Sequence, residues 1–118
     1  MTKGNLPEHF RYINPILEVL QEIGGSSKTS EVVDLVVEKL NISAEELQIT
    51  IESGQQKVIN QIHWAKLMLV KTGNLDPSRM GVWNLTEKGL SAKLSKDEMM
   101  PIWELMMSSA SPKSFHNM

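Results

Sequence analysis

Polar side chains with the chemistry to read a DNA duplex are concentrated between residues 53 and 72. The first group lies on one predicted helix: Gln55, Gln56, Lys57, Asn60 and Gln61. Asparagine and glutamine amides can each make two hydrogen bonds to adenine, and a lysine ammonium group can reach guanine or a phosphate. When such a helix enters the major groove, its N-terminal half meets the base edges. These residue types at this spacing predict base contacts, with an ordinary solvated helix face as the alternative.

Basic side chains after this group are candidates for contacts to the DNA backbone. Arg79 lies between Pro77 and Gly81 at the tip of a predicted hairpin, where an arginine can enter a minor groove or bind a phosphate. The alternative for Arg79 is an exposed turn residue without function. The other candidate DNA-binding residues lie on the helix or follow the hairpin: His63, Lys66, Lys71 and Lys88.

Charge is distributed unevenly along the 118 residues, whose net charge is −2. Residues 1–52 hold four Lys or Arg and nine Asp or Glu, so their net charge is −5. Residues 53–96 hold seven Lys or Arg and two Asp or Glu, so theirs is +5, and residues 97–118 have a net charge of −2. Because phosphate binding depends on local potential, the middle segment is the electrostatic candidate for nucleic acid. A solvated lysine face is the alternative.

Other chemistry has little support in the sequence. There are no cysteines, and the three histidines are far apart, so we predict no metal site and no cofactor. No Asp or Glu stands two positions before a lysine, which leaves out the Glu-x-Lys element of restriction-type nucleases. A phosphate-binding glycine loop and a nucleophile elbow are also missing. We therefore predict that the chain has no catalytic residues and is not an enzyme.

The segment before residue 53 predicts two helices separated by a very short extended piece at 26–28. Asn14 suits the N-cap of the first helix and Pro15 its first position, and the apolar spacing continues to the glycines at 24–25. Thr29 or Ser30 suits the cap of the second helix, which has a stripe of valines. The connection that follows is too long for a plain helix-turn-helix.

Two capping-box patterns follow, one at 43–46 and one at 53–56. The first predicts a short helical turn, and residues 48–51 then alternate as an extended segment would. The second predicts a helix over 54–72, which at ~1.5 Å per residue is about 28 Å long. Its apolar face consists of Val58, Ile62, Ala65 and Leu69, flanked by Ile59 and Met68.

A hairpin and two further helices are expected after the long helix. Leu75 and residues 82–85 bracket a Pro- and Gly-containing turn, and Trp83, like Trp64 on the helix, is expected to pack rather than stack on bases. Thr86 suits the cap of a short helix that ends at residue 94. Pro101 suits the start of a Met-rich helix, and the residues beyond 108 are expected to be disordered.

The predicted fold class is mainly α (α+β): a winged helix-turn-helix with a helical core, a small β-hairpin wing and an extra C-terminal helix. We expect an N-terminal extension at 1–11, the winged-helix domain at 12–94, and a Met-rich helix and tail at 95–118. No apolar run approaches the ~18 residues of a membrane span, and the N-terminus does not resemble a signal peptide. A cytoplasmic protein without membrane contact is therefore expected.

Several motifs together resemble the N-terminal domain of Mrr-type restriction system proteins. They occur in order as Ile-Leu-Glu-Val-Leu at 16–20, Gly-Gly at 24–25, Ser-Gly at 53–54, Asn-Gln-Ile-His-Trp-Ala-Lys at 60–66, Leu69, Lys-Thr-Gly at 71–73 and Gly-Val-Trp-Asn-Leu-Thr-Glu-Lys-Gly at 81–89. The resemblance covers residues 12–94. It implies a winged helix that delivers DNA, often methylated DNA, to a separate nuclease domain. Gln61 departs from the family, whose members often have arginine there, and the chain stops where the nuclease domain would begin.

These observations predict a domain that binds double-stranded DNA, with a nuclease supplied by another domain or partner. Three alternatives stay open. The first is a winged-helix module for protein–protein interaction, with a homodimer formed through the segment from Met99 to Met107. The second is a small transcription regulator. The third is that the sequence is one domain of a longer nuclease.

Overall fold

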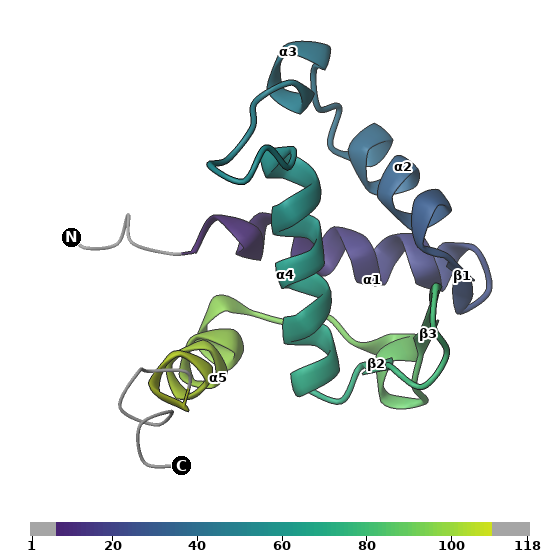
Figure 1. Cartoon of the computed structure of the whole chain (residues 1–118). Helices are drawn as coiled ribbons and strands as arrows, with labels where there is room; N and C mark the ends of the chain where they lie inside the picture. The colour runs from purple at the N-terminus through teal and green to yellow at the C-terminus, as the bar shows by residue number, and fades with distance from the viewer. Residues whose placement is uncertain (1–6, 110–118) are drawn as a thin grey trace.

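The computed structural model describes residues 7–109 and confirms the α+β class. Ten elements follow one another in these residues: η2 (Glu8–Tyr12), α1 (Ile13–Glu22), β1 (Ser26–Lys28), α2 (Thr29–Lys39), α3 (Ala44–Leu47), α4 (Lys57–Lys71), β2 (Leu75–Asp76), β3 (Val82–Leu85), η3 (Lys88–Ser91) and α5 (Lys96–Ser109). Helix α4 runs through the middle of the molecule, with α2 and the strands on one side and α5 on the other (Figure 1). The predicted disorder beyond residue 108 concerns residues that lie mostly outside this description.

A three-stranded antiparallel sheet confirms both the short extended piece and the hairpin. The strand order is β1-β3-β2, with Ser27 opposite Trp83 and Leu75 opposite Leu85. Strand β1 therefore completes the sheet on which the hairpin is built. Gly25, the residue before β1, has a φ of 104°, and its carbonyl accepts a hydrogen bond from the Leu85 amide at 2.7 Å. Three helices with this sheet and hairpin give the architecture of a winged helix.

The core forms where α1, α2 and α4 meet the inner face of the sheet. The predicted apolar face of α4 is buried as expected, and its Met68 is fully buried instead of lying at the edge. Trp83 is 1% exposed, which confirms it as a packing residue. The largest fully buried side chains come from five elements: Trp83, Tyr12, Ile13, Ile16, Leu17, Leu20, Ile62, Met68, Leu69, Val32, Val36 and Val58.

The predicted start of α1 is wrong because η2 continues directly into it. Asn14 is therefore the second residue of the helix and caps nothing. Its amide instead donates to the Leu94 carbonyl at 2.6 Å, and its carbonyl oxygen accepts from the Leu94 amide at 2.8 Å. The cap of α2 is also one residue earlier than predicted, at Lys28, because the Thr29 amide donates to the Gly81 carbonyl at 3.1 Å.

Helix α4 begins three residues later than predicted. The Ser53 hydroxyl accepts only a 3.4 Å bond from the Gln55 amide, and Gln56 is the N-cap. The backbone before α4 is committed to a bridge between Thr50 and Gln56, flanked by a bond from the Lys57 amide to the Ile49 carbonyl at 2.8 Å. The Gln56 side chain, which a capping box would direct to the Ser53 amide, instead donates to the Leu47 carbonyl at 2.7 Å. The 15 residues of α4 give a helix of about 22 Å.

The elements after the hairpin also differ from the predictions. Thr86 accepts from the Gly89 amide at 3.1 Å, but the helix that follows is only the four residues of η3. Helix α5 starts at Lys96, and Pro101 lies inside it. The reason is a reciprocal cap: Ser95 Oγ accepts from the Glu98 amide at 3.2 Å, and the Glu98 carboxylate accepts from the Ser95 amide at 2.8 Å.

The remaining capping box is confirmed. Ser43 Oγ accepts from the Glu46 amide at 3.0 Å and opens α3, the short turn of helix that projects from the top of the molecule in Figure 1. This extra turn accounts for the long connection between α2 and α4. The segment at 48–51, expected to be extended, forms one isolated bridge and no strand.

Candidate nucleic-acid interface

The polar residues at the start of α4 have hydrogen-bond partners within the fold. The Asn60 amide donates to Gln55 Oε1 at 3.0 Å, so these two candidate base contacts bind each other. The Gln56 amide donates to the Leu47 carbonyl at 2.7 Å and joins α4 to α3. Contact with a base would have to replace these bonds. The structure therefore gives the three side chains a role in shaping the turn before α4.

Lys57 and Gln61 share an acidic partner that sequence reasoning missed. Glu8 of η2 accepts from Gln61 Nε2 at 2.5 Å and lies 3.2 Å from the Lys57 ammonium. The bond from Gln61, followed by the Lys57 bond and charge, lowers the pKa of Glu8 below its usual value. Helix α4 itself contains no acidic residue, but this carboxylate reaches it from 53 positions away in sequence. No sequence signal pairs these segments.

A cavity of about 500 Å³ lies beside this carboxylate, between η2, α3 and α4. Its wall contains Phe10 and Val58, and its rim contains charges of both signs. Two of these charges form an ion pair, in which Arg11 Nη1 lies 2.7 Å from the Glu46 carboxylate. This end of α4 therefore combines an apolar floor with mostly neutralised charges.

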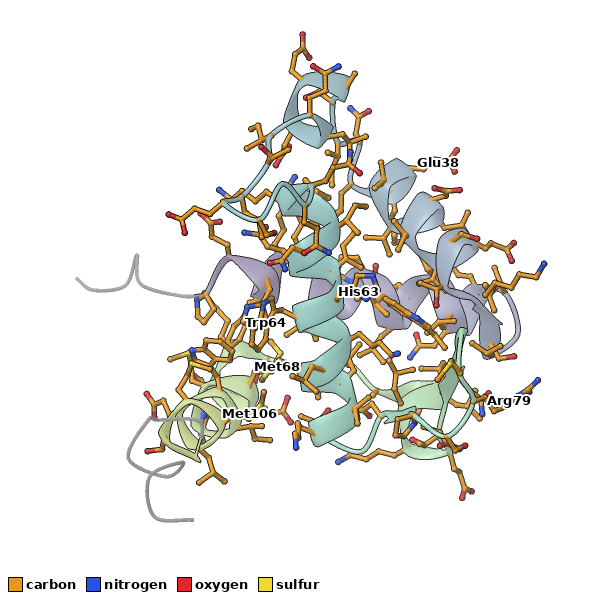
Figure 2. All side chains as sticks on the ribbon, in the orientation of Figure 1. Glu38, His63, Trp64, Met68, Arg79 and Met106 are labelled. Carbon is orange, nitrogen blue, oxygen red and sulfur yellow. The ribbon has the colours of Figure 1, made fainter. Side chains whose placement is uncertain are left out.

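The middle of α4 exposes several side chains to solvent. His63, Trp64 and Leu67 are exposed there, and with Asn60 they line a shallow hollow of about 190 Å³. His63 and Trp64 point to opposite sides of the helix (Figure 2). The His63 ring meets the buried Trp83 edge-on, with ring centroids 5.7 Å apart. Burial, and the charge of Lys66, lower the pKa of His63, so this ring favours its neutral form.

Trp64 belongs to an aromatic cluster that joins α4 to α5 and η2. Its ring centroid lies 5.9 Å from that of Trp103 and 6.1 Å from that of His9. Trp64 remains 37% exposed, so it packs at the edge of the domain and not in the core. His9 is buried among these rings, and burial lowers its pKa from 6.5 to about 4. Helix α5 is thereby packed on its own domain.

The basic candidates further along the chain have no carboxylate partner among the residues described. The ammonium group of Lys66 lies 5.2 Å from the centroid of the Trp83 ring, a cation–π contact. That of Lys88 donates to the Thr72 carbonyl at 2.7 Å, at the negative end of α4. Lys71 and Arg79 are both exposed, and Arg79 projects from the hairpin tip, away from the body of the domain (Figure 2).

A second surface groove connects the hairpin to the start of α2. It measures about 560 Å³, and its lining includes Lys28, Ser30, His63 and Gly81. Lys28 is exposed and pairs in the sheet with Val82, the first residue after the hairpin turn. Sequence reasoning missed Lys28 and Ser30. Their signal was the polar run at 26–30 immediately before a predicted helix.

The structure thus divides the ten predicted residues into two groups. Gln55, Gln56, Lys57, Asn60 and Gln61 are bonded to each other, to α3 or to η2. The other five lie in the middle or C-terminal half of α4 or on the hairpin side: His63, Lys66, Lys71, Arg79 and Lys88. Within residues 7–109, no three metal-ligating side chains gather, and no helix there is long and apolar enough to cross a membrane.

The fold and this surface define an α+β winged-helix domain with a basic helix-and-hairpin side. Comparison with protein families gives a match to the Mrr N-terminal domain over residues 10–95. The chain belongs to this family. Neither the curated proteins nor the solved structures contain a significant match.

Proposed function

We propose that this domain binds double-stranded DNA with the surface formed by the middle of α4, the start of α2 and the hairpin. The observation that carries the proposal is the separation of paired from unpaired cations. Four basic residues on this surface have no carboxylate within 4 Å in the described part of the chain; we call them the unpaired cations: Lys28, Lys66, Lys71 and Arg79.

Three basic residues outside this surface are paired with carboxylates. Arg11 pairs with Glu46, Lys57 with Glu8, and Lys39 lies 3.2 Å from Glu22. A phosphate gains little from a cation that already has a carboxylate partner, because the carboxylate must first be displaced. The unpaired cations carry only mobile counterions, and release of those ions favours DNA binding. Membership of a restriction-system domain family supports the same partner.

Reading of the bases is assigned to the exposed middle of α4. His63 supplies hydrogen-bonding groups there, while Trp64 and Leu67 supply apolar surface around the same shallow hollow. The C5 methyl of thymine, or of a methylated cytosine, lies in the major groove and is recognised by apolar contact. This mixture supports the finer part of the proposal, which is preference for methylated DNA.

Titration of a labelled duplex at several salt concentrations tests the proposal. Binding through four phosphates gives a log–log slope of roughly −3 to −4, and each lost contact reduces it by about 0.9. Lys66→Gln and Arg79→Gln should each weaken binding and flatten the slope. Lys39→Gln is the matched control, because Lys39 is paired with Glu18 and Glu22. Absence of binding at low salt, or equal losses in all three variants, would overturn it.

The proposal assigns recognition, and no chemistry, to the described residues. Cleavage of DNA is assigned to a nuclease domain elsewhere, in a partner or in a longer chain. A duplex incubated with the protein and Mg²⁺ should therefore remain intact, and a methylated duplex should bind more tightly than its unmethylated twin. Cleavage by the purified protein would contradict this division of labour.

Self-association is the second candidate function, favoured by the apolar residues that α5 exposes. Leu105 is 68% exposed and Met107 is 40% exposed, both within the Met-rich segment. A dimer formed here should dissociate when Met107→Lys is introduced, as measured by light scattering during size-exclusion chromatography. A protein that is monomeric at all concentrations would remove this candidate.

A further inference from the structure

Met80 at the hairpin tip is almost fully solvated. Its side chain is 97% exposed, against 68% for Leu105, another exposed large apolar residue. The folded domain therefore gains no hydrophobic stabilisation from Met80. Its whole apolar surface remains available to a partner, and burial of such a side chain is favourable.

The loop that presents Met80 is held at both ends. Asp76 Oδ1 accepts from the Ser78 amide at 2.9 Å, and the Arg79 carbonyl accepts from the Val82 amide at 3.3 Å. Gly81 has a φ of 76°, and its carbonyl accepts from the Thr29 amide of α2. The tip is a narrow turn fixed to the sheet and to α2, so its side chains are presented in a defined position.

Two basic residues lie near Met80, while Asp34 of α2 lines the neighbouring groove together with Gly81. Arg79 precedes it, and Lys28 is paired with Val82 one strand position from the turn. The carboxylate in this loop, Asp76, is turned back onto Ser78, and bonds from Ser78 lower its pKa. An apolar tip flanked by cations complements a partner with an apolar interior behind a negatively charged surface. Stacked bases behind phosphates have this character, whereas an apolar protein groove would leave Arg79 and Lys28 uncompensated.

We propose that Met80 is a wedge that enters the minor groove and partly unstacks one base step while Arg79 holds the groove edge. This inference rests on the proposed DNA binding and deepens it. With α4 in the major groove, the hairpin faces an adjoining groove, and methionine is among the apolar side chains that proteins insert between base steps. The unstacked step kinks the duplex toward its major groove.

Fluorescence of 2-aminopurine, placed at successive positions of a duplex, tests the wedge because its emission rises when the base unstacks. The wild-type protein should raise the emission at one step. Met80→Ala should abolish the rise and weaken binding about tenfold, since part of the burial energy offsets unstacking. Met80→Leu should retain both effects. Ile49→Ala, which shortens another exposed apolar side chain on neither the hairpin nor α5, is the matched control.

The outcomes separate the wedge from the underlying function. A wild-type protein that binds no duplex overturns both. Normal duplex binding with no rise in emission at any position overturns the wedge alone, as does unchanged affinity and emission in Met80→Ala. Weaker binding by Met80→Ala without any emission change also overturns it, because Met80 would then contact the groove without unstacking a base. Since Met80 is exposed, thermal melting of each variant should match that of the wild type.

Discussion

Acidification should destabilise the domain at a pH well above the range in which its carboxylates titrate, because of His9. This histidine is 6% exposed, and its Nε2 has no hydrogen-bond partner among the described residues. Its ring centroid lies 4.6 Å from that of Trp103 and 5.1 Å from that of Phe10. Burial among these rings lowers its pKa to about 4, because no group there stabilises the protonated form.

The sign and size of the effect follow from the two pKa values. Above pH 6.5 the ring is neutral in both folded and unfolded chains, so stability is unaffected. As the pH falls below 6.5, the unfolded chain binds a proton that the folded domain excludes, and the loss is complete near pH 4. A shift of this size corresponds to about 3 kcal/mol of unfolding free energy. Most of the loss precedes the titration of Glu8, whose pKa is lowered from 4.5.

Urea unfolding followed by tryptophan fluorescence from pH 7.5 to 4.5 measures this loss. The wild-type midpoint should fall with pH at a constant slope of the transition. His9→Phe keeps an aromatic ring and removes the titrating group, so its stability should be nearly flat over the same range. His63→Asn separates the smaller contribution of His63, whose pKa is also lowered by burial. An equal pH dependence in His9→Phe and wild type would refute the assignment.

Three further predictions concern packing and caps. Gly89→Ala places a Cβ 2.3 Å from the Asn74 carbonyl oxygen, a backbone atom with no rotamer to adopt. Thermal melting should therefore show a loss of about 3 kcal/mol, and wild-type stability would contradict the tight approach. Asn14→Ala removes two bonds to the Leu94 backbone and should cost about 2 kcal/mol; proteolysis at 92–95 should accelerate, and an unchanged cleavage rate would count against it. Ser95→Ala should cost about 1 kcal/mol by removing a cap. Circular dichroism should then show that α5 melts at a lower temperature than in the wild type, and an unchanged melting curve would contradict the role of this cap.

The sequence predicted the helices that carry a strong apolar period. The buried residues of α4 could be predicted because apolar residues recur at helical spacing within one continuous segment. The hairpin was predictable for the same reason, since Pro77 and Gly81 lie between two apolar stretches. Both patterns lie within short, continuous stretches of the sequence.

The capping boxes show where local patterns stop being sufficient. Ser43 opens a helix as expected, but Ser53 has the same spacing and does not. The difference arises from the bridge between Thr50 and Gln56, which takes up the backbone groups ahead of α4. Ser95 opens α5 with an equally visible pattern, and Pro101 was the misleading signal.

The DNA-binding role of the candidate residues stays a prediction, and the contacts that surround them could not be read from the sequence. Residue types identified α4 and Arg79, but the partners of Lys57 and Gln61 come from Glu8. A contact with a carboxylate from a distant segment produces no periodic pattern in the sequence. The unpaired state of Lys66 is equally invisible in the sequence, because it depends on which acidic residues the fold brings near.

Two hydrogen bonds between Asn14 and Leu94 join the start of α1 to the segment before α5. Residues 80 positions apart meet there, so the segment that enters the fold and the segment that leaves it run side by side. A domain with adjoining entry and exit can be inserted into another protein, or joined to one, without stretching its core. The two bonds thus hold together segments from the two ends of the winged-helix domain, on elements other than the hairpin.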